Sequence, residues 1–72
     1  MSSITFYQAC RIAAIKEGTD IPKLTKEMNQ GELKQRYNYV YQVLNGQRRN
    51  NDIVNWFKSR LQIKDTDYNP IP

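Results

Sequence analysis

The sequence predicts an all-α protein built from four short helices. Apolar residues recur three or four positions apart in four separate segments, which is the spacing of one face of a helix. Residues that favour helix starts precede these segments, and a glycine follows two of them. A chain of 72 residues is long enough for one small domain, which we expect over residues 1–63.

The first helix is predicted over residues 6–17. Thr5 and Gln8 fit a capping box, in which each side chain accepts a hydrogen bond from the other residue's backbone N–H. Gly18 supplies the stop, because glycine readily adopts the left-handed conformation that ends helices. The expected apolar stripe comprises Phe6, Ala9, Cys10 and Ala13, joined by Ile12. We interpret Cys10 as a small core residue rather than a reactive thiol.

The second helix is predicted over residues 21–28. Thr19 or Asp20 can cap it, and Pro22 falls in the first turn, where its missing N–H costs nothing. Its expected core residues are Ile21, Leu24 and Met28.

The third helix is predicted over about residues 34–45, with Gly46 as its stop. Residues 29–32 are ambiguous, because they fit both a turn containing Gly31 and a capping box that opens this helix. The expected apolar stripe comprises Leu33, Tyr37, Val40, Tyr41 and Leu44.

The fourth helix is predicted to begin after Asn50 or Asn51, either of which can cap it. Its apolar face comprises Ile53, Val54, Phe57 and Leu61, with Trp56 beside it. Residues 64–72 contain two prolines and few apolar residues, so a flexible C-terminal tail is predicted there. Tyr68 and Ile71 of this tail are candidates for docking on a partner.

The composition argues against an enzyme. The chain has no histidine, which removes Ser-His and Cys-His nucleophile pairs and zinc sites that need imidazole. The carboxylates give no general acid and base pair, and the single cysteine forms no intrachain disulfide. We therefore expect no catalytic residue, metal, cofactor or small-molecule substrate. No segment fits a signal peptide or a membrane span, so a cytoplasmic protein is expected.

Residues 34–51 favour binding to nucleic acid. This window contains four Lys or Arg, seven Asn or Gln, three Tyr and no carboxylate, in a chain of net charge +4. Cationic side chains neutralise phosphates and release counterions. The amides of Asn and Gln match the donor and acceptor pattern on a base edge. Double-stranded DNA is therefore the expected partner.

The chain resembles the helix-turn-helix domains of the lambda-repressor and Cro type in three parts. These are residues 18–28, residues 39–49 and the amphipathic helix that follows them. The resemblance spans about residues 10–63 and suggests a phage or mobile-element protein. It gives helix-anchoring places to Leu24, Thr25 and Val40, and it ends the recognition helix at Asn45 and Gly46.

The resemblance also implies the site residues. In this family the third helix enters the major groove and its outer side chains read bases, while flanking residues bind phosphates. The base-reading residues implied here are Tyr37, Asn38 and Gln42. The phosphate-binding residues implied here are Lys34, Gln35, Arg36, Arg48, Arg49 and Asn50. Tyr37 and Tyr41 also lie on the apolar stripe, which favours at least partial burial of both.

The chain departs from the family pattern in two places. The segment after Met28 is several residues longer than usual, so residues 30–36 either lengthen the turn or extend the third helix. Family members commonly carry an arginine at the position of Ala14. Either Arg11 or Lys16 substitutes for it, or one phosphate contact of the family is absent here.

A second resemblance concerns residues 53–60, which are similar to the third helix of a homeodomain. Ser59 stands where that family reads adenine with an asparagine, and Leu61 replaces a basic residue. Trp56 and Phe57 are more simply explained as core aromatics.

Two functions follow as expectations. The first is a Cro-type transcriptional regulator that binds operator DNA as a dimer on a pseudo-palindromic site. The second is a protein-binding modulator of the antirepressor kind, which uses the same fold to bind a phage repressor. The longer segment before the third helix and the many tyrosines favour the second function, since Tyr is enriched at protein interfaces.

Overall fold

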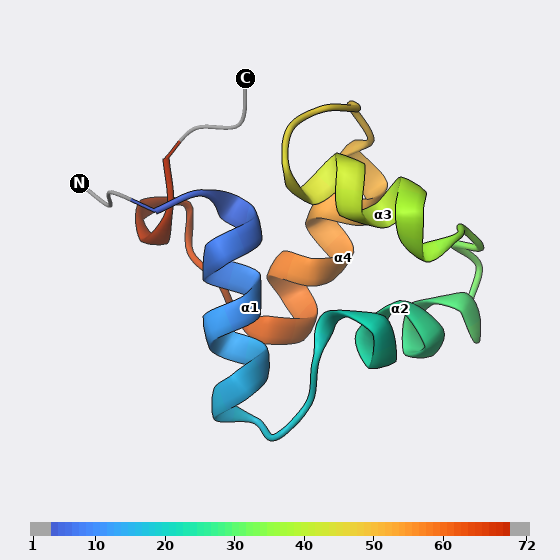
Figure 1. Ribbon diagram of the computed structural model, residues 1–72, viewed down its shortest axis with the longest axis horizontal. Helices are drawn as coiled ribbons and strands as arrows, with labels where there is room; N and C mark the ends of the chain where they lie inside the picture. Colours follow the sequence, from blue (N-terminus) through green and yellow to red (C-terminus); the bar gives the residue numbers. More distant parts are fainter. Residues whose placement is uncertain (1–3, 70–72) are drawn as a thin grey trace.

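The computed structural model describes residues 4–69 and contains four α-helices in that range (Figure 1). They are α1 (Phe6–Lys16), α2 (Ile21–Asn29), α3 (Tyr37–Leu44) and α4 (Asn51–Leu61), followed by a short 3-10 turn, η1 (Asp65–Asp67). The described residues include no strand, so the prediction of a small all-α domain with four helices is confirmed. In Figure 1, α1 lies along one side of the molecule, α2 and α3 occupy the other side, and α4 crosses between them.

Polar side chains fix the starts of three helices. The Gln8 N–H donates to Thr5 Oγ1 over 3.1 Å and the Thr5 N–H donates to Gln8 Oε1 over 2.8 Å, which confirms the predicted capping box. Asp20 and Asn50 each accept a hydrogen bond from the backbone N–H three residues later, at the starts of α2 and α4. These side chains satisfy backbone donors that have no partner inside the helix.

Left-handed residues mark the ends of helices. Gly18 follows α1 with φ +76°, and Gly46 follows α3 with φ +80°, so both predicted stops are confirmed. Residues that carry a side chain rarely adopt a positive φ. Gln62 nevertheless adopts φ +56° at the end of α4.

One apolar core joins all four helices. The buried apolar residues are Phe6, Ala9, Cys10, Ala14, Ile21, Leu24, Met28, Val40, Val43, Leu44, Ile53, Phe57, Leu61 and Ile63. Most of the predicted core residues belong to this set. Three buried residues, Ala14, Val43 and Ile63, are absent from the predicted stripes. α1 and α3 turn a slightly different side inward than the spacing alone suggests, and Ile63 follows the end of α4.

Several apolar residues of the predicted stripes remain accessible. Ile12 is 45% exposed, and Tyr37 and Tyr41 are 38% and 39% exposed, while the neighbouring Ile15 reaches 65%. The two tyrosines flank the buried face of α3. More than half of the surface of each residue is therefore covered, and the rest is accessible to solvent.

Residues 64–69 pack against the helices, whereas the composition predicts a flexible tail from residue 64. The rings of Tyr68 and Phe6 meet edge to face, with 4.7 Å between their centroids. The Asn69 N–H donates to the carbonyl oxygen of Ile4 over 2.8 Å. The tail therefore docks on the start of α1. Tyr68, which the sequence offers for docking on a partner, contacts Phe6 of this same chain.

A carboxylate joins the tail to α4. Asp65 forms an ion pair with Lys58 and accepts a hydrogen bond from the Tyr68 hydroxyl over 3.1 Å. The bond to Lys58, and then the bond to Tyr68, lower the pKa of Asp65, and the same carboxylate raises the pKa of Lys58. Composition does not reveal such pairs. Ile71, the other predicted docking residue of the tail, lies outside the described residues.

Cys10 is completely buried in the inner face of α1, as predicted for a small core residue. Burial raises the pKa of its thiol from the ordinary value of 9.0 to about 12, because the thiolate would lose its hydration.

The free energy of unfolding should therefore decrease as the pH rises above about 9. There the unfolded chain ionises Cys10 while the native protein keeps it protonated, so the native state binds more protons and loses stability with increasing pH. Urea unfolding at several pH values should show that the stability advantage over Cys10→Ala narrows between pH 9 and about 12. An advantage that stays constant across this range contradicts the prediction.

Candidate nucleic-acid interface

α3 is anchored by one face and open on the other. Val40, Val43 and Leu44 are at most 1% exposed and belong to the core. Asn38 and Asn45 lie on the outer side and are exposed, with Tyr41 at its edge. Burial of the inner face therefore directs amide and phenol groups toward solvent.

α3 begins at Tyr37, and the prediction that the helix starts near residue 34 is wrong at this end. Arg36 occupies the N-cap position with an extended backbone, and its side chain makes no capping hydrogen bond. Lys34, Gln35 and Arg36 thus lie before the helix, in the connection from α2.

One amide explains this late start. Asn29 Oδ1 accepts the N–H of Gln35 over 2.6 Å, and Asn29 Nδ2 donates to the Gln35 carbonyl oxygen over 2.9 Å. Nδ2 also donates to the carbonyl oxygen of Thr25, within α2, over 2.8 Å. A further turn of α3 would use the Gln35 carbonyl oxygen as an acceptor, whereas here that oxygen accepts a hydrogen bond from the Asn29 amide of α2. The extra residues 30–36 therefore lengthen the turn.

A second polar network lies at the other end of α3. Arg48 Nε donates to Gln42 Oε1 over 2.6 Å, and the Arg48 guanidinium carbon lies 5.7 Å from the centroid of the Tyr39 ring. The Tyr39 hydroxyl accepts a hydrogen bond from Asn50 Nδ2 over 3.3 Å, while Asn50 Oδ1 caps α4. The connection between α3 and α4 is thus tied to α3 by side chains.

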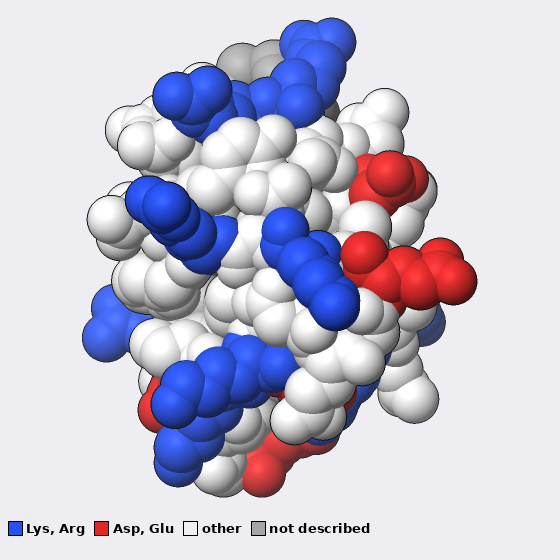
Figure 2. Space-filling model, turned by 90° about the vertical axis from the view of Figure 1, so that its right-hand side faces the viewer, with Lys and Arg blue, Asp and Glu red and all other residues white. Residues whose placement is uncertain are grey.

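Unpaired cations surround α3. Within residues 4–69, no carboxylate lies within ion-pair distance of Lys34, Arg36, Arg48 or Arg49, and all four are exposed. Figure 2 shows the side of the molecule that carries α2, α3 and their connection, with Lys and Arg side chains spread over it and carboxylates at its margins. This surface has the charge that a phosphate backbone requires.

Other carboxylates are paired elsewhere. Arg60 of α4 forms ion pairs with Glu27 of α2 and with Glu17, whose Oε1 lies 3.0 Å from Nη1. Hydrogen bonding to Glu27, and then to Glu17, raises the pKa of Arg60. These pairs join the ends of three helices, and none of the three carboxylates of the described ion pairs is bonded to a cation near α3.

The three predicted base-reading residues differ in their surroundings. Asn38 is exposed, and its side chain makes no hydrogen bond to other described residues. Burial, and then the neighbouring Tyr7 and Tyr41, raise the pKa of Tyr37, which is part of a cluster of tyrosine rings. Gln42 is half-buried and its carbonyl oxygen is bonded to Arg48.

The six predicted phosphate-binding residues all lie in the two connections that flank α3. Lys34, Arg36, Arg48 and Arg49 present exposed cations. The Gln35 side chain is exposed while its backbone is held by Asn29. Asn50 is half-buried and both ends of its amide already have partners, so its main role in the structure is to cap α4 and hold Tyr39.

Sequence reasoning missed the role of Asn29. The available signal was an asparagine at the last position of a helix, shortly before Gly31, where a short polar side chain often bonds the following backbone. Its partner six residues later was not predictable from that signal. Sequence reasoning also missed the structural role of Tyr39, which connects Arg48 with Asn50.

α4 supports the core explanation of its aromatic pair. Phe57 is fully buried, and Trp56 is partly buried with its ring edge-on to Phe57 at 5.0 Å between centroids. The prediction of a core aromatic is confirmed for Phe57, whereas Trp56 packs against the core from outside and is only partly buried.

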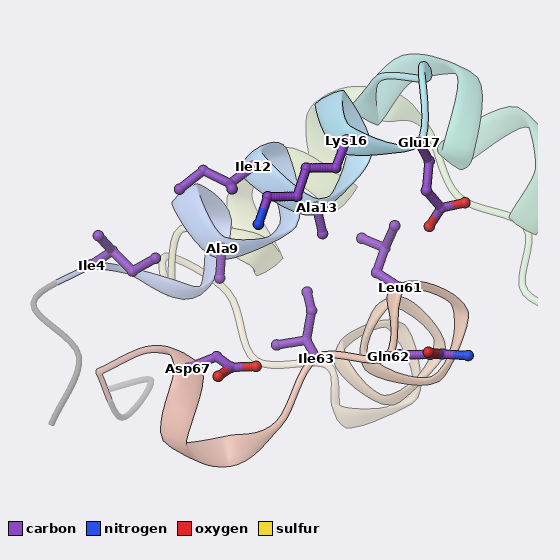
Figure 3. Close-up of a pocket in the computed structure, with 10 residues that line it drawn as sticks. All are labelled: Ile4, Ala9, Ile12, Ala13, Lys16, Glu17, Leu61, Gln62, Ile63 and Asp67. Atoms are coloured by element: carbon purple, nitrogen blue, oxygen red, sulfur yellow. The ribbon is translucent and has the colours of Figure 1, made fainter.

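A separate apolar groove of about 420 Å³ lies between α1 and the end of α4. Figure 3 shows Ala9 and Ala13 of α1 facing Ile63 across this groove, with charged side chains around its edge. The charged residues at this edge are Lys16, Glu17 and Asp67.

Comparisons with family models, with curated proteins and with solved structures found no match to this chain. Over residues 4–69, the structure contains neither a helix long and apolar enough to cross a membrane nor a group of three or more side chains suited to hold a metal ion.

The Asn29 bonds predict a local loss of order when the side chain is removed. In Asn29→Ala, the Gln35 amide should lose its protection from hydrogen exchange, because its acceptor is gone. The unfolding free energy should also decrease by about 0.5–1.5 kcal/mol, the usual net contribution of an intramolecular hydrogen bond, because water can reach the Gln35 backbone groups once the Asn29 amide is gone. The exposed neighbour Gln30→Ala is the matched control and should change neither measurement. Retained protection at Gln35 in Asn29→Ala contradicts the assignment.

Proposed function

We propose that this chain is a transcriptional regulator of the Cro type that binds double-stranded DNA in the cytoplasm of its host. α3 would lie in the major groove, and the connections on either side of it would contact phosphates.

The observation that carries this proposal is the surface around α3. It combines an exposed asparagine, a glutamine and tyrosines with four cations that have no carboxylate partner among the described residues. A protein surface whose cations served only solubility would be expected to intersperse both signs of charge. Amides beside free cations instead suit a groove lined by base edges and phosphates.

A single unit of this size offers few base contacts, so we propose that two copies bind a pseudo-palindromic site. Half-sites about one helical turn apart would then match the twofold symmetry of the dimer. Specific binding through one small module buries only about 600–1,000 Å² of protein surface, which favours such pairing.

The test is fluorescence anisotropy on random and locus-derived duplexes, titrated with salt. The Arg48→Ala, Arg49→Ala double variant should bind about tenfold more weakly at low salt and lower the salt slope by about 1 to 2, since the Arg49 phosphate contact and the positive charge of Arg48 beside α3 are lost. Lys64→Ala removes an exposed cation of the tail, which packs on the start of α1 and not beside α3, and should leave binding unchanged. Absence of duplex binding at low salt, or equal binding by the double variant, contradicts the proposal.

A specific observation also favours a second function, which is binding to a phage repressor. Ile15 of α1 is exposed and lines a groove together with Tyr7 and with Tyr37 of α3, so apolar surface continues from one helix to the other. Exposed apolar surface of this kind commonly marks a protein contact.

This second function predicts a 1:1 complex with a repressor encoded beside the gene, measured by light scattering after gel filtration. The complex should persist in the Arg48→Ala, Arg49→Ala double variant and weaken by about tenfold or more in Tyr41→Ala, because aromatic residues dominate protein interfaces. A complex that is lost in the arginine double variant but retained in Tyr41→Ala would exclude this function.

A further inference from the structure

The side chains of Gln42 and Arg48 form one unit on the outer side of α3. Arg48 Nε donates to Gln42 Oε1 over 2.6 Å. A guanidinium group has only donors, so the atom of the Gln42 amide that faces it must be the oxygen. The Gln42 NH₂ group is therefore the end of the amide that points away from Arg48.

Arg48 is held in this place by more than one contact. The N–H groups of Gln47 and Arg48 both donate to the carbonyl oxygen of Gln42, over 2.8 Å and 3.3 Å, which folds the chain back over the end of α3. The guanidinium also lies over the Tyr39 ring, and the Tyr39 hydroxyl is bonded to Asn50. The unit is thus arranged before any ligand binds.

This arrangement changes what Gln42 offers to a base. A glutamine that reads adenine donates to N7 and accepts from the adenine amino group with its oxygen. In Gln42 that oxygen is already bonded, and the adjacent positive charge disfavours a second approaching donor. What remains is the NH₂ group together with the Nη atoms of Arg48, a surface made only of donors.

We propose that Arg48 determines which base Gln42 reads, and that the pair selects guanine instead of adenine. Guanine is the base that presents two acceptors, N7 and O6, side by side in the major groove. Asn38 has no bonded partner among the described residues and keeps both its donor and its acceptor for adenine. This inference rests on the proposed DNA-binding function and assigns separate base preferences within it.

The experiment selects binding sites from duplexes with a random central segment, using the full chain and three variants. Gln42→Ala identifies the position that Gln42 reads, because the preference there is lost. Arg48→Ala frees the Gln42 oxygen. Arg49→Ala is the matched control, since Arg49 is an exposed neighbouring cation that makes no hydrogen bond to Gln42 within residues 4–69. Anisotropy on single-base variants of the selected site then measures the preference.

With the unchanged chain, replacing guanine by adenine at that position should weaken binding by about tenfold or more. In Arg48→Ala the preference should reverse toward adenine, whereas Arg49→Ala should weaken all duplexes alike and keep the guanine preference. An unchanged preference in Arg48→Ala, or adenine selected by the unchanged chain, overturns the inference while leaving DNA binding established. If no duplex is enriched at low salt, the proposed function fails and this inference fails with it.

A measurement without DNA tests the geometry itself. The Arg48 Nε–H should exchange with solvent more slowly than the Arg49 Nε–H in NMR spectra, and Gln42→Ala should remove the difference. Equal exchange at the two arginines in the unchanged chain overturns the inference.

Discussion

The burial of one face of α3 is the constraint on which the candidate interface depends. Val40, Val43 and Leu44 fill the core with the aromatic side chain of Phe57, so α3 cannot rotate without exposing apolar surface. Rotation would also bury amides such as that of Asn38 without partners, which costs free energy. The packing of α3, a helix of eight residues, therefore decides which of its own side chains face solvent.

Two polar networks complete this arrangement at the ends of α3. At its start, the Asn29 amide forms hydrogen bonds with both backbone groups of Gln35 and so holds the long connection against the end of α2. At its end, the network through Tyr39 joins α3 to the cap of α4. Exposed hydrogen bonds contribute little individually, but together they define the course of both connections that carry the free cations.

The cations around α3 and the exposed aliphatic side chains of α1 lie on different parts of the molecule. Glu17, at the end of α1, and Glu27 of α2 pair with Arg60 at one end of the fold, whereas the cations around α3 lack carboxylate partners among the described residues. Ile12 and Ile15 lie on α1, and the Tyr7 and Tyr41 rings connect that helix to α3. A DNA contact on α3 and a protein contact on α1 thus require different surfaces, although the tyrosines are close to both.

The sequence by itself determined the four helices, most of the core and the capping box at Thr5, because these depend on interactions between residues three or four positions apart. It also located the cationic window around α3. Only the tertiary structure decided the start of α3, the bonded oxygen of Gln42, the docking of Tyr68 and the pairing of Arg60 with residues 33 and 43 positions away. Those features depend on which groups meet in space after the helices pack, and hydrophobic spacing carries no information about such meetings.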